Sequence, residues 1–579
     1  MRTIISNSAH RSAWNDRSLI GVVAFALALA WLLILGGRSV ALAADEEGDE
    51  LPTLCAGVTA ISPEECGALV MLYEETDGPN WTNNANWLQV DGVTSPCDWY
   101  GVTCANGGVD EVRLTGNGLA GRLPAAVGQL TNLRVLDLAG NRLGPRMASQ
   151  ICALTATVAE ADFGYNRLDV RGAATRTCLD EMDPDWRQTQ TVAPRDVAPS
   201  AFTATGIELS WTPIPYDGDG GYYEVSYSET FSGDYTVHGA TADRAAAGYL
   251  VDGLASGTSY FLRVEAVTPA HANHPDTLVG DAVTTIGVTA GSERVLLAAV
   301  ISADNNLSSY VPSIIRRMAR GSALNPNLTA IVLSDQRRAN DTRVTLIENG
   351  TLTQLDIVSQ VWGTEELDMA DPDILSWFLR YARETVQPDR TVVSLIGHGV
   401  GPTPDLAWVP PTQPGEPLPS PVDGIPPLPR GLEFTPADVT DGSYLSTLDL
   451  ARALLDATDD GANPFDILFF DQCFQGNLDV LYEVRSVAEV FIASPNYAWL
   501  VAPYAQYIAR MAPAADNAVI AGDILRRYEA NLNNRHPNAI FWARSSDINN
   551  IAAAVSDLGE ALLRALDGGE AATIRAAAL

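Results

Sequence analysis

Lysine is absent from the 579-residue chain, so all 36 of its basic residues are arginines. Acidic residues number 71, which gives a formal net charge of −35 at pH 7. Such a surface repels nucleic acid and anionic membranes and attracts cationic partners. The composition therefore argues against a nucleic-acid-binding protein, although an acidic surface that only keeps the chain soluble is the simpler explanation of the charge.

Several motifs of known chemistry are also missing. The sequence has no Gly-x-Ser-x-Gly elbow, no glycine loop that would cradle phosphate and no zinc-ligand spacing. Histidine is scarce, and only His398 and His536 fall where strands alternate with helices. His536 lies in a polar loop and is predicted to be a surface residue. His398 follows an apolar run and is flanked by glycines, which favours an acid–base role.

Cysteine is almost confined to the first third of the chain. Six clustered cysteines in an exported protein suggest three bridges, although the sequence alone allows fifteen pairings. The seventh, Cys473, stands alone. A buried inert thiol is one explanation, but its place at a strand end after Asp471 favours a nucleophile. The simplest pairing of the six is Cys55 with Cys66, Cys97 with Cys104 and Cys152 with Cys178.

The N-terminus has the order of an export signal. Arginines precede an apolar run from Leu19 to Leu35, and Ala41–Ala43 offers small residues for cleavage. Residues 1–43 are therefore predicted to be a signal peptide, and the protein to be secreted or at the cell surface. A run of ~17 apolar residues could also remain as a membrane anchor.

A chain of this length is expected to hold on the order of three or four domains. Residues 44–185 contain leucine patterns around Asn117, Asn141 and Asn166, at spacings of 24 and 25. This predicts a short leucine-rich repeat solenoid closed at both ends by disulfide caps. Its exposed face could bind a protein or cell-surface ligand, or the region could be a spacer.

The next segment, residues 190–288, changes to short alternating strands punctuated by Gly, Asp and Pro. Trp211 on an early strand and Tyr260 six residues after Leu254 resemble the core tryptophan and tyrosine corner of a fibronectin type III sandwich. Residues 290–579 alternate strands with helices. That alternation predicts an α/β domain with a mostly parallel sheet covered on both faces.

Two apolar strands in this last region end in reactive side chains. Residues 391–396 lead into Gly397-His398-Gly399, and residues 465–470 lead into Asp471-Gln472-Cys473. Parallel strands open at one sheet edge, so the imidazole and the thiol are expected to meet there. Cysteine proteolysis needs this pair, because the imidazole sets the protonation of the thiol and protonates the leaving amine.

These motifs, with the upstream segment Leu367–Pro372, resemble the clostripain-like cysteine peptidases, relatives of the caspases and gingipains. The resemblance covers residues 290–579 and implies a caspase-like fold and a cysteine endopeptidase acting on protein or peptide substrates. It implies that the backbone N–H groups of Gly399 and Cys473 form the oxyanion hole. It also implies that Asp471 binds a basic substrate side chain, whereas the residues alone equally allow Asp471 to accept backbone hydrogen bonds.

Other expectations follow from the same resemblance. Acidic residues are expected after the strand that follows the nucleophile, but Ala493–Trp499 has none, which leaves a neutral or aromatic-lined pocket open. Calcium is a candidate cofactor, with Asp304, Asp368, Asp371 and Asp373 as oxygen ligands. The Ala303–Leu307 turn looks like a family element, and its simplest role is to cap the following helix.

Two hypotheses remain open at this stage. The proline-rich stretch 402–431 reads as an exposed loop and is a candidate site of maturation by cleavage. As an alternative to an enzyme, the protein could be a catalytically inactive cell-surface recognition or adhesion protein that keeps the α/β fold. The presence of both His398 and Cys473 favours the enzyme.

Overall fold

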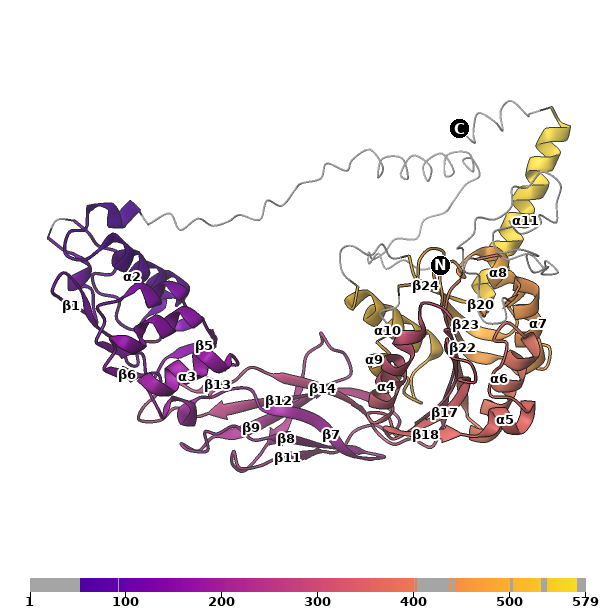
Figure 1. Ribbon diagram of the computed structural model, residues 1–579, viewed down its shortest axis with the longest axis horizontal. Helices are drawn as coiled ribbons and strands as arrows, with labels where there is room; N and C mark the ends of the chain where they lie inside the picture. The colour runs from indigo at the N-terminus through magenta and orange to yellow at the C-terminus, as the bar shows by residue number, and fades with distance from the viewer. Residues whose placement is uncertain are drawn as a thin grey trace, which may run out of the picture. The chain divides into compact units, whose positions relative to one another are not determined.

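The computed structural model describes residues 53–91, 93–399, 401–402, 437–438, 443–499, 503–532 and 539–569. They form two compact units (Figure 1), one of residues 53–254 and 260–287 and one of residues 255–259 and 288–569. The predicted signal peptide and almost all of the proline-rich stretch lie outside the described residues. No helix in the described ranges combines the length and the hydropathy of a membrane span.

The N-terminal half of the first unit is built on short parallel strands. β2, β4 and β6 pair in parallel, and β1 adds to β2 in the antiparallel sense. Leucines of each repeat point inward and are fully buried. The elements are α2 (Pro63–Glu75), β1 (Val102–Ala105), β2 (Gly108–Arg113), β3 (Ala120–Leu123), β4 (Val135–Asp137), β5 (Arg142–Met147), β6 (Glu160–Asp162) and α3 (Ala173–Met182).

Buried asparagines tie these turns together. The Asn141 side chain accepts hydrogen bonds from the N–H groups of Asn117 and Leu119, each at 3.0 Å, and donates to three backbone carbonyls. Asn166 repeats the arrangement one turn on, where it accepts from the N–H of Leu143 at 2.9 Å. The amides thus satisfy backbone groups that would otherwise be buried without partners. The assignment of these turns to a leucine-rich repeat solenoid stays a prediction.

Three disulfides close this region, and they are the pairs predicted from the sequence: Cys55–Cys66, Cys97–Cys104 and Cys152–Cys178. Cys473 is the free cysteine. The prediction of the pairing is confirmed, and it leaves a single titratable thiol in the chain.

A two-sheet β-sandwich follows in the same unit. Trp211 is buried and packs edge-on against Tyr223, with ring centroids 5.1 Å apart. The predicted core tryptophan is confirmed, and Tyr260 is buried as well. One sheet holds β7 (Arg195–Thr203), β8 (Gly206–Thr212) and β11 (Gly248–Val251); the other holds β9 (Tyr222–Ser228), β10 (Thr236–Ala240), β12 (Ser259–Thr268), β13 (Leu278–Val279) and β14 (Val283–Val288).

The repeat region and the sandwich pack against each other within this unit. The imidazole of His274 is 1 % exposed, and its Nε2 lies 3.1 Å from the carbonyl oxygen of Asn141. Ion pairs join Arg142 to Asp276 at 2.6 Å and Arg167 to Asp281 at 2.5 Å. The two predicted modules are therefore in direct contact, while their boundaries at 185 and 190 stay predictions.

The second unit is an eight-stranded sheet in the order β18-β17-β16-β15-β19-β22-β23-β24. The five strands from β16 to β23 are parallel to one another, and the outer three are antiparallel to their neighbours. The prediction of a mostly parallel sheet is confirmed. The strands are β15 (Val295–Ser302), β16 (Leu328–Asp335), β17 (Arg343–Glu348), β18 (Thr351–Leu355), β19 (Arg390–Ile396), β22 (Phe465–Asp471), β23 (Ala488–Ala493) and β24 (Phe541–Arg544), and β20 (Ala437–Asp438) pairs separately with β21 (Ser443–Tyr444).

Helices cover both faces of this sheet (Figure 1). Alternate residues of β22 point to opposite faces: Phe469 packs with α4, α9 and α10, and Phe470 packs with the helices of the other face. Both faces are therefore apolar, as the continuous hydrophobic runs require. The helices are α4 (Val311–Ser322), α9 (Tyr504–Ile508) and α10 (Asn517–Ala530) on one face, and α5 (Ile357–Trp362), α6 (Pro372–Val386), α7 (Thr447–Ala457), α8 (Leu478–Glu483) and α11 (Ser545–Asp567) on the other.

We predict that Asn141→Ala destabilises the first unit by at least about 3 kcal/mol, because it leaves several buried backbone groups without partners. Denaturant unfolding of the full chain, followed by tryptophan fluorescence, measures the loss. Gln129→Ala, an exposed position of the same region, is the matched control. Equal unfolding midpoints for the two variants would contradict the role given to the asparagine.

Candidate active site

The carboxyl ends of β15, β19 and β22 lie side by side. Ile301 pairs with Ile396, and Ile396 pairs with Asp471. His398 lies two positions after Ile396, and Cys473 lies two positions after Asp471. The parallel register therefore delivers the two turns to the same edge of the sheet, as expected from the sequence.

The turn that carries His398 touches the turn that carries Cys473. A methyl group on Gly399 would lie 2.2 Å from the carbonyl oxygen of Cys473 and 3.0 Å from its nitrogen. Such distances leave no room for any side chain, so glycine is required here for close backbone approach. The two backbones are adjacent here, and the oxyanion role of their N–H groups stays a prediction.

The imidazole of His398 is half-buried. Its Nε2 lies 2.6 Å from Oδ1 of Asn306, a residue of the turn after β15. The sequence alone did not single out Asn306, although it lies in the Ala303–Leu307 turn that resembles the family element. Three successive strand ends thus contribute Asn306, His398 and Cys473.

Cys473 is half-buried, and the N–H of Ala498 donates to its Sγ at 3.4 Å. Burial raises the pKa of the Cys473 thiol, the N–H of Ala498 partly offsets this rise, and the charge of Asp471 adds to it. The neutral thiol is therefore favoured at rest, and a nearby base is needed to form the thiolate.

The residue after Cys473, Phe474, is held in place by the loop that follows β23. Phe474 has a left-handed backbone with φ 60°, which is uncommon for a residue with a side chain. Its N–H donates to the carbonyl oxygen of Asn496 at 2.8 Å, and its ring meets that of Tyr497 with centroids 5.2 Å apart. The loop after β23 therefore fixes the backbone immediately after Cys473.

Asp471 is 4 % exposed and points to the face covered by α9. The hydroxyl of Tyr504 donates to its carboxylate at 2.9 Å, and the same hydroxyl lies 2.8 Å from Ser394 Oγ. Among the described residues, the donor to Asp471 is thus a phenol, and the expected alternative of a backbone-bonded carboxylate is wrong. Burial raises the pKa of Asp471 to about 7, although the bond from Tyr504 opposes the rise.

The predicted calcium ligands do not gather into one site. Asp371 instead caps α6, where it accepts from the N–H of Asp373 at 2.8 Å. Another acidic group lies beyond β16, where carboxylate oxygens of Asp335, Asp341 and Glu366 lie within 4.8 Å of one another. Hard oxygen ligands of this kind suit calcium, and Glu366 Oε1 is buried without a hydrogen-bond donor. These three residues, rather than the predicted four, would hold such an ion.

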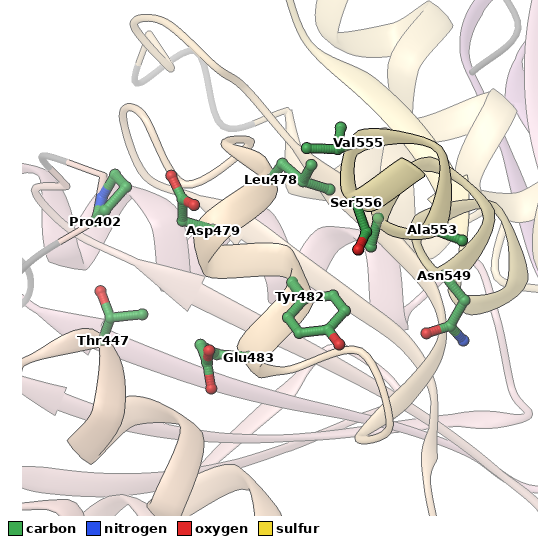
Figure 2. A pocket seen from close by; sticks show the side chains of 11 residues that line it. Pro402, Thr447, Leu478, Asp479, Tyr482, Glu483, Asn549, Ala553, Val555 and Ser556 are labelled. Carbon is green, nitrogen blue, oxygen red and sulfur yellow. The ribbon is translucent and has the colours of Figure 1, made fainter. Parts of the chain in front are cut away.

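A cavity of about 880 Å³ lies between α8 and α11 (Figure 2). Pro402, which follows the His398 turn, lies on its wall together with Leu478, which follows the Cys473 turn. Acidic side chains of α8 and apolar side chains of α11 face this space. No pattern in the sequence had indicated this cavity, because one of its walls is α11, which is distant from α8 in the sequence.

The sequence comparisons agree with the two resemblances. Residues 299–413 and 428–577 match the model of the Clostripain family, and residues 192–277 match that of the fibronectin type III domain. Clostripain of Hathewaya histolytica is 23 % identical over 230 residues, which cover 36 % of this chain and 40 % of clostripain. A leucine-rich repeat receptor protein kinase of Arabidopsis thaliana, EMS1, is 36 % identical over 78 residues, or 14 % of this chain and 6 % of the kinase.

The chain thus spans less than half the length of these relatives. Among solved structures, a secreted C11 cysteine protease from Bacteroides thetaiotaomicron in complex with an irreversible peptide inhibitor has 20 % identity and a TM-score of 0.36. That comparison covers 46 % of this chain and 71 % of the other. The expected resemblance to clostripain-like peptidases is confirmed by the family match, which supports a cysteine peptidase.

We predict that the stability of the protein falls as pH rises from about 4 to about 7 through Asp471. In this range the folded carboxyl keeps a proton that the unfolded chain has already lost, so the effect is complete once pH exceeds the folded pKa. Asp471→Asn, which cannot ionise, should escape a loss on the order of 4 kcal/mol. Melting temperatures of both proteins at several pH values measure it.

The matched control for this measurement is Asp460→Asn, an exposed aspartate on the same unit. Its melting temperature should follow that of the unmodified protein at every pH. A constant difference between Asp471→Asn and the unmodified protein across the whole range would contradict the titration of a buried carboxyl.

Proposed function

Since residues 299–413 and 428–577 match the Clostripain family, we propose that the protein is an exported cysteine endopeptidase with Cys473 as nucleophile and His398 as general acid and base. The observation that carries this proposal is the contact between their turns, where Gly399 lies against the backbone of Cys473. A thiol with a raised pKa beside a turn that carries an imidazole is suited to proton transfer at the moment of attack.

In this mechanism His398 takes the proton of the Cys473 thiol, and the sulfur attacks the carbonyl carbon of the scissile peptide. The backbone N–H groups of Gly399 and Cys473 donate to the resulting oxyanion. His398 then gives its proton to the leaving amine as the C–N bond breaks. A water molecule, deprotonated by His398, then attacks the thioester; the C–S bond breaks, the acid leaves and His398 returns its proton to the sulfur.

For the substrate, we propose that Asp471 lies at the base of the pocket that receives the residue before the scissile bond. Its carboxyl is buried among Tyr504, Tyr507 and Tyr528, whose pKa values are raised by burial and by the charge of Asp471. A carboxylate in such surroundings would attract a cationic side chain when it is ionised. When Asp471 is protonated, the same tyrosines would suit a neutral substrate side chain.

The other parts of the chain extend this proposal. Residues 1–43 would direct export and be removed, so that the protein is secreted; retention as an anchor at the cell surface is the alternative. Residues 44–185 would form a leucine-rich repeat solenoid, 190–288 a fibronectin type III domain and 290–579 the peptidase domain. The repeats would bind a protein or surface ligand or act as a spacer, and cleavage within 402–431 would mature the enzyme.

An inactive recognition protein is the second candidate, and it is not favoured. The family match covers both His398 and Cys473, and the tight contact at Gly399 keeps their turns together. A fold that had lost catalysis would not need either residue.

The central test uses peptide reporters that end in Arg, Lys or a neutral residue. The unmodified protein should cleave at least one of them, and Cys473→Ala and His398→Ala should reduce the rate at least a hundredfold, or about 2.7 kcal/mol of transition-state stabilisation. His238→Ala, in the sandwich, is the control and should keep full activity. Equal rates for the unmodified protein and Cys473→Ala would refute the proposal.

A further test separates the pocket from the nucleophile. As pH rises through about 7, Asp471 ionises, so kcat/KM for the Arg reporter should increase relative to that for the neutral reporter. Asp471→Asn should remove this dependence while it keeps cleavage of the neutral reporter. A ratio that does not change with pH in the unmodified protein would exclude Asp471 as the specificity acid.

A further inference from the structure

We propose that Asn306 is a positioning residue for the peptidase reaction. Its side-chain oxygen holds the imidazole of His398 in the orientation and tautomer that the thiol of Cys473 requires. This inference rests on the proposed function and adds a third loop to it.

The order of the strands explains why the residue comes from this loop. β19 lies between β15 and β22 in the sheet, so the His398 turn has the Cys473 turn on one side and the turn after β15 on the other. The turn after β15 is therefore placed to support the imidazole from the side away from the Cys473 turn. Asn306 of that turn bonds to the imidazole.

The proposal also assigns the hydrogen of the neutral ring to one nitrogen. Nε2 of His398 lies 2.6 Å from Oδ1 of Asn306, and an amide oxygen only accepts hydrogen bonds. We therefore assign the hydrogen to Nε2 and the lone pair of the neutral ring to Nδ1. We assign the acceptance of the thiol proton to Nδ1. When the ring becomes an imidazolium, the bond to Asn306 becomes charge-assisted and stronger.

The backbone around Asn306 is held from inside the protein. Asn305 is fully buried, and its Oδ1 accepts from the N–H of Leu307 at 2.9 Å. The N–H of Ala303 donates to the carbonyl oxygen of Asp335 at 3.1 Å. The side chain of Asn306 therefore projects from a fixed turn, which a positioning role requires.

The simpler role expected for this turn, capping of the following helix, is not what the structure shows. The short 3₁₀ helix Ser308–Tyr310 and α4 after it both begin without a side-chain cap hydrogen bond. The Asn306 amide is instead bonded to His398. The imidazole thus accounts for Asn306, and the N–H of Leu307 accounts for Asn305.

The test compares Asn306→Ala and Asn306→Asp in the full chain. Asn306→Ala should lower kcat by roughly ten- to a hundredfold with KM little changed, because a hydrogen bond to a charged group is lost. It should also move the acidic limb of the pH–rate profile to lower pH, since the neutral ring is the base and the imidazolium is less stabilised. Asn306→Asp should retain activity and move that limb to higher pH, because a carboxylate favours the charged ring.

Alkylation of Cys473 by iodoacetamide gives a second readout that needs no turnover. The other six cysteines are in disulfides, so the reaction reports on this thiol alone. Its rate against pH should show the same shifts in the two variants. If the unmodified protein cleaves no reporter but these shifts appear, the proposed function fails, whereas the effect of Asn306 on the imidazole and the thiol stands.

Ser309→Ala, an exposed residue close to Asn306 in sequence, is the matched control and should behave like the unmodified protein. The inference is overturned if Asn306→Ala keeps the kcat and both limbs of the pH profile. It is also overturned if Asn306→Asp loses as much activity as Asn306→Ala with no shift of the limb, because that result indicates a role in packing only.

Discussion

The candidate site depends on the parallel pairing of β15, β19 and β22. Each of these strands is buried on both faces, so the register is fixed by packing along its whole length. A slip of one residue would turn every side chain of a strand to the opposite face. Because the register is fixed, the turns that follow the strands are fixed as well, and Asn306, His398 and Cys473 reach one edge in a row.

Burial shapes the chemistry of this edge. It raises the pKa values of both Cys473 and Asp471, so neither group ionises readily by itself. A desolvated thiol is a poor nucleophile until a base accepts its proton. The half-buried imidazole of His398, in the adjacent turn, is suited to receive it. In the proposed mechanism, the environment that makes the thiolate costly would also couple its formation to the presence of the imidazole.

The sequence predicted those features that depend on local pattern. Continuous apolar runs predicted the strands before His398 and Cys473, and the spacing of the buried asparagines predicted the turns of the N-terminal region. The disulfide pairs followed from proximity along the chain, because short loops bring cysteines together without knowledge of the fold.

The features that the sequence did not predict depend on which elements pack side by side. Tyr504 reaches Asp471 because α9 covers that face of the sheet, and the acidic group beyond β16 forms because distant loops meet there. The role of Asn306 could not be predicted without the strand order. A polar turn is compatible with several roles until the residues beside it are known. The hydrophobic pattern of a sequence identifies a helix or strand and its buried face. It does not identify which other element packs against that face.

The contacts within the first unit bear on what the N-terminal modules can do. A flexible linker between repeats and sandwich would let a bound ligand move freely with respect to the sandwich. Here the buried His274 and the Arg142–Asp276 ion pair join the two, and removing His274 would leave the carbonyl of Asn141 without this partner. Asn141 is also the residue that organises its repeat turn. The same position therefore stabilises the repeats and their contact with the sandwich, which indicates that the two modules act as one body.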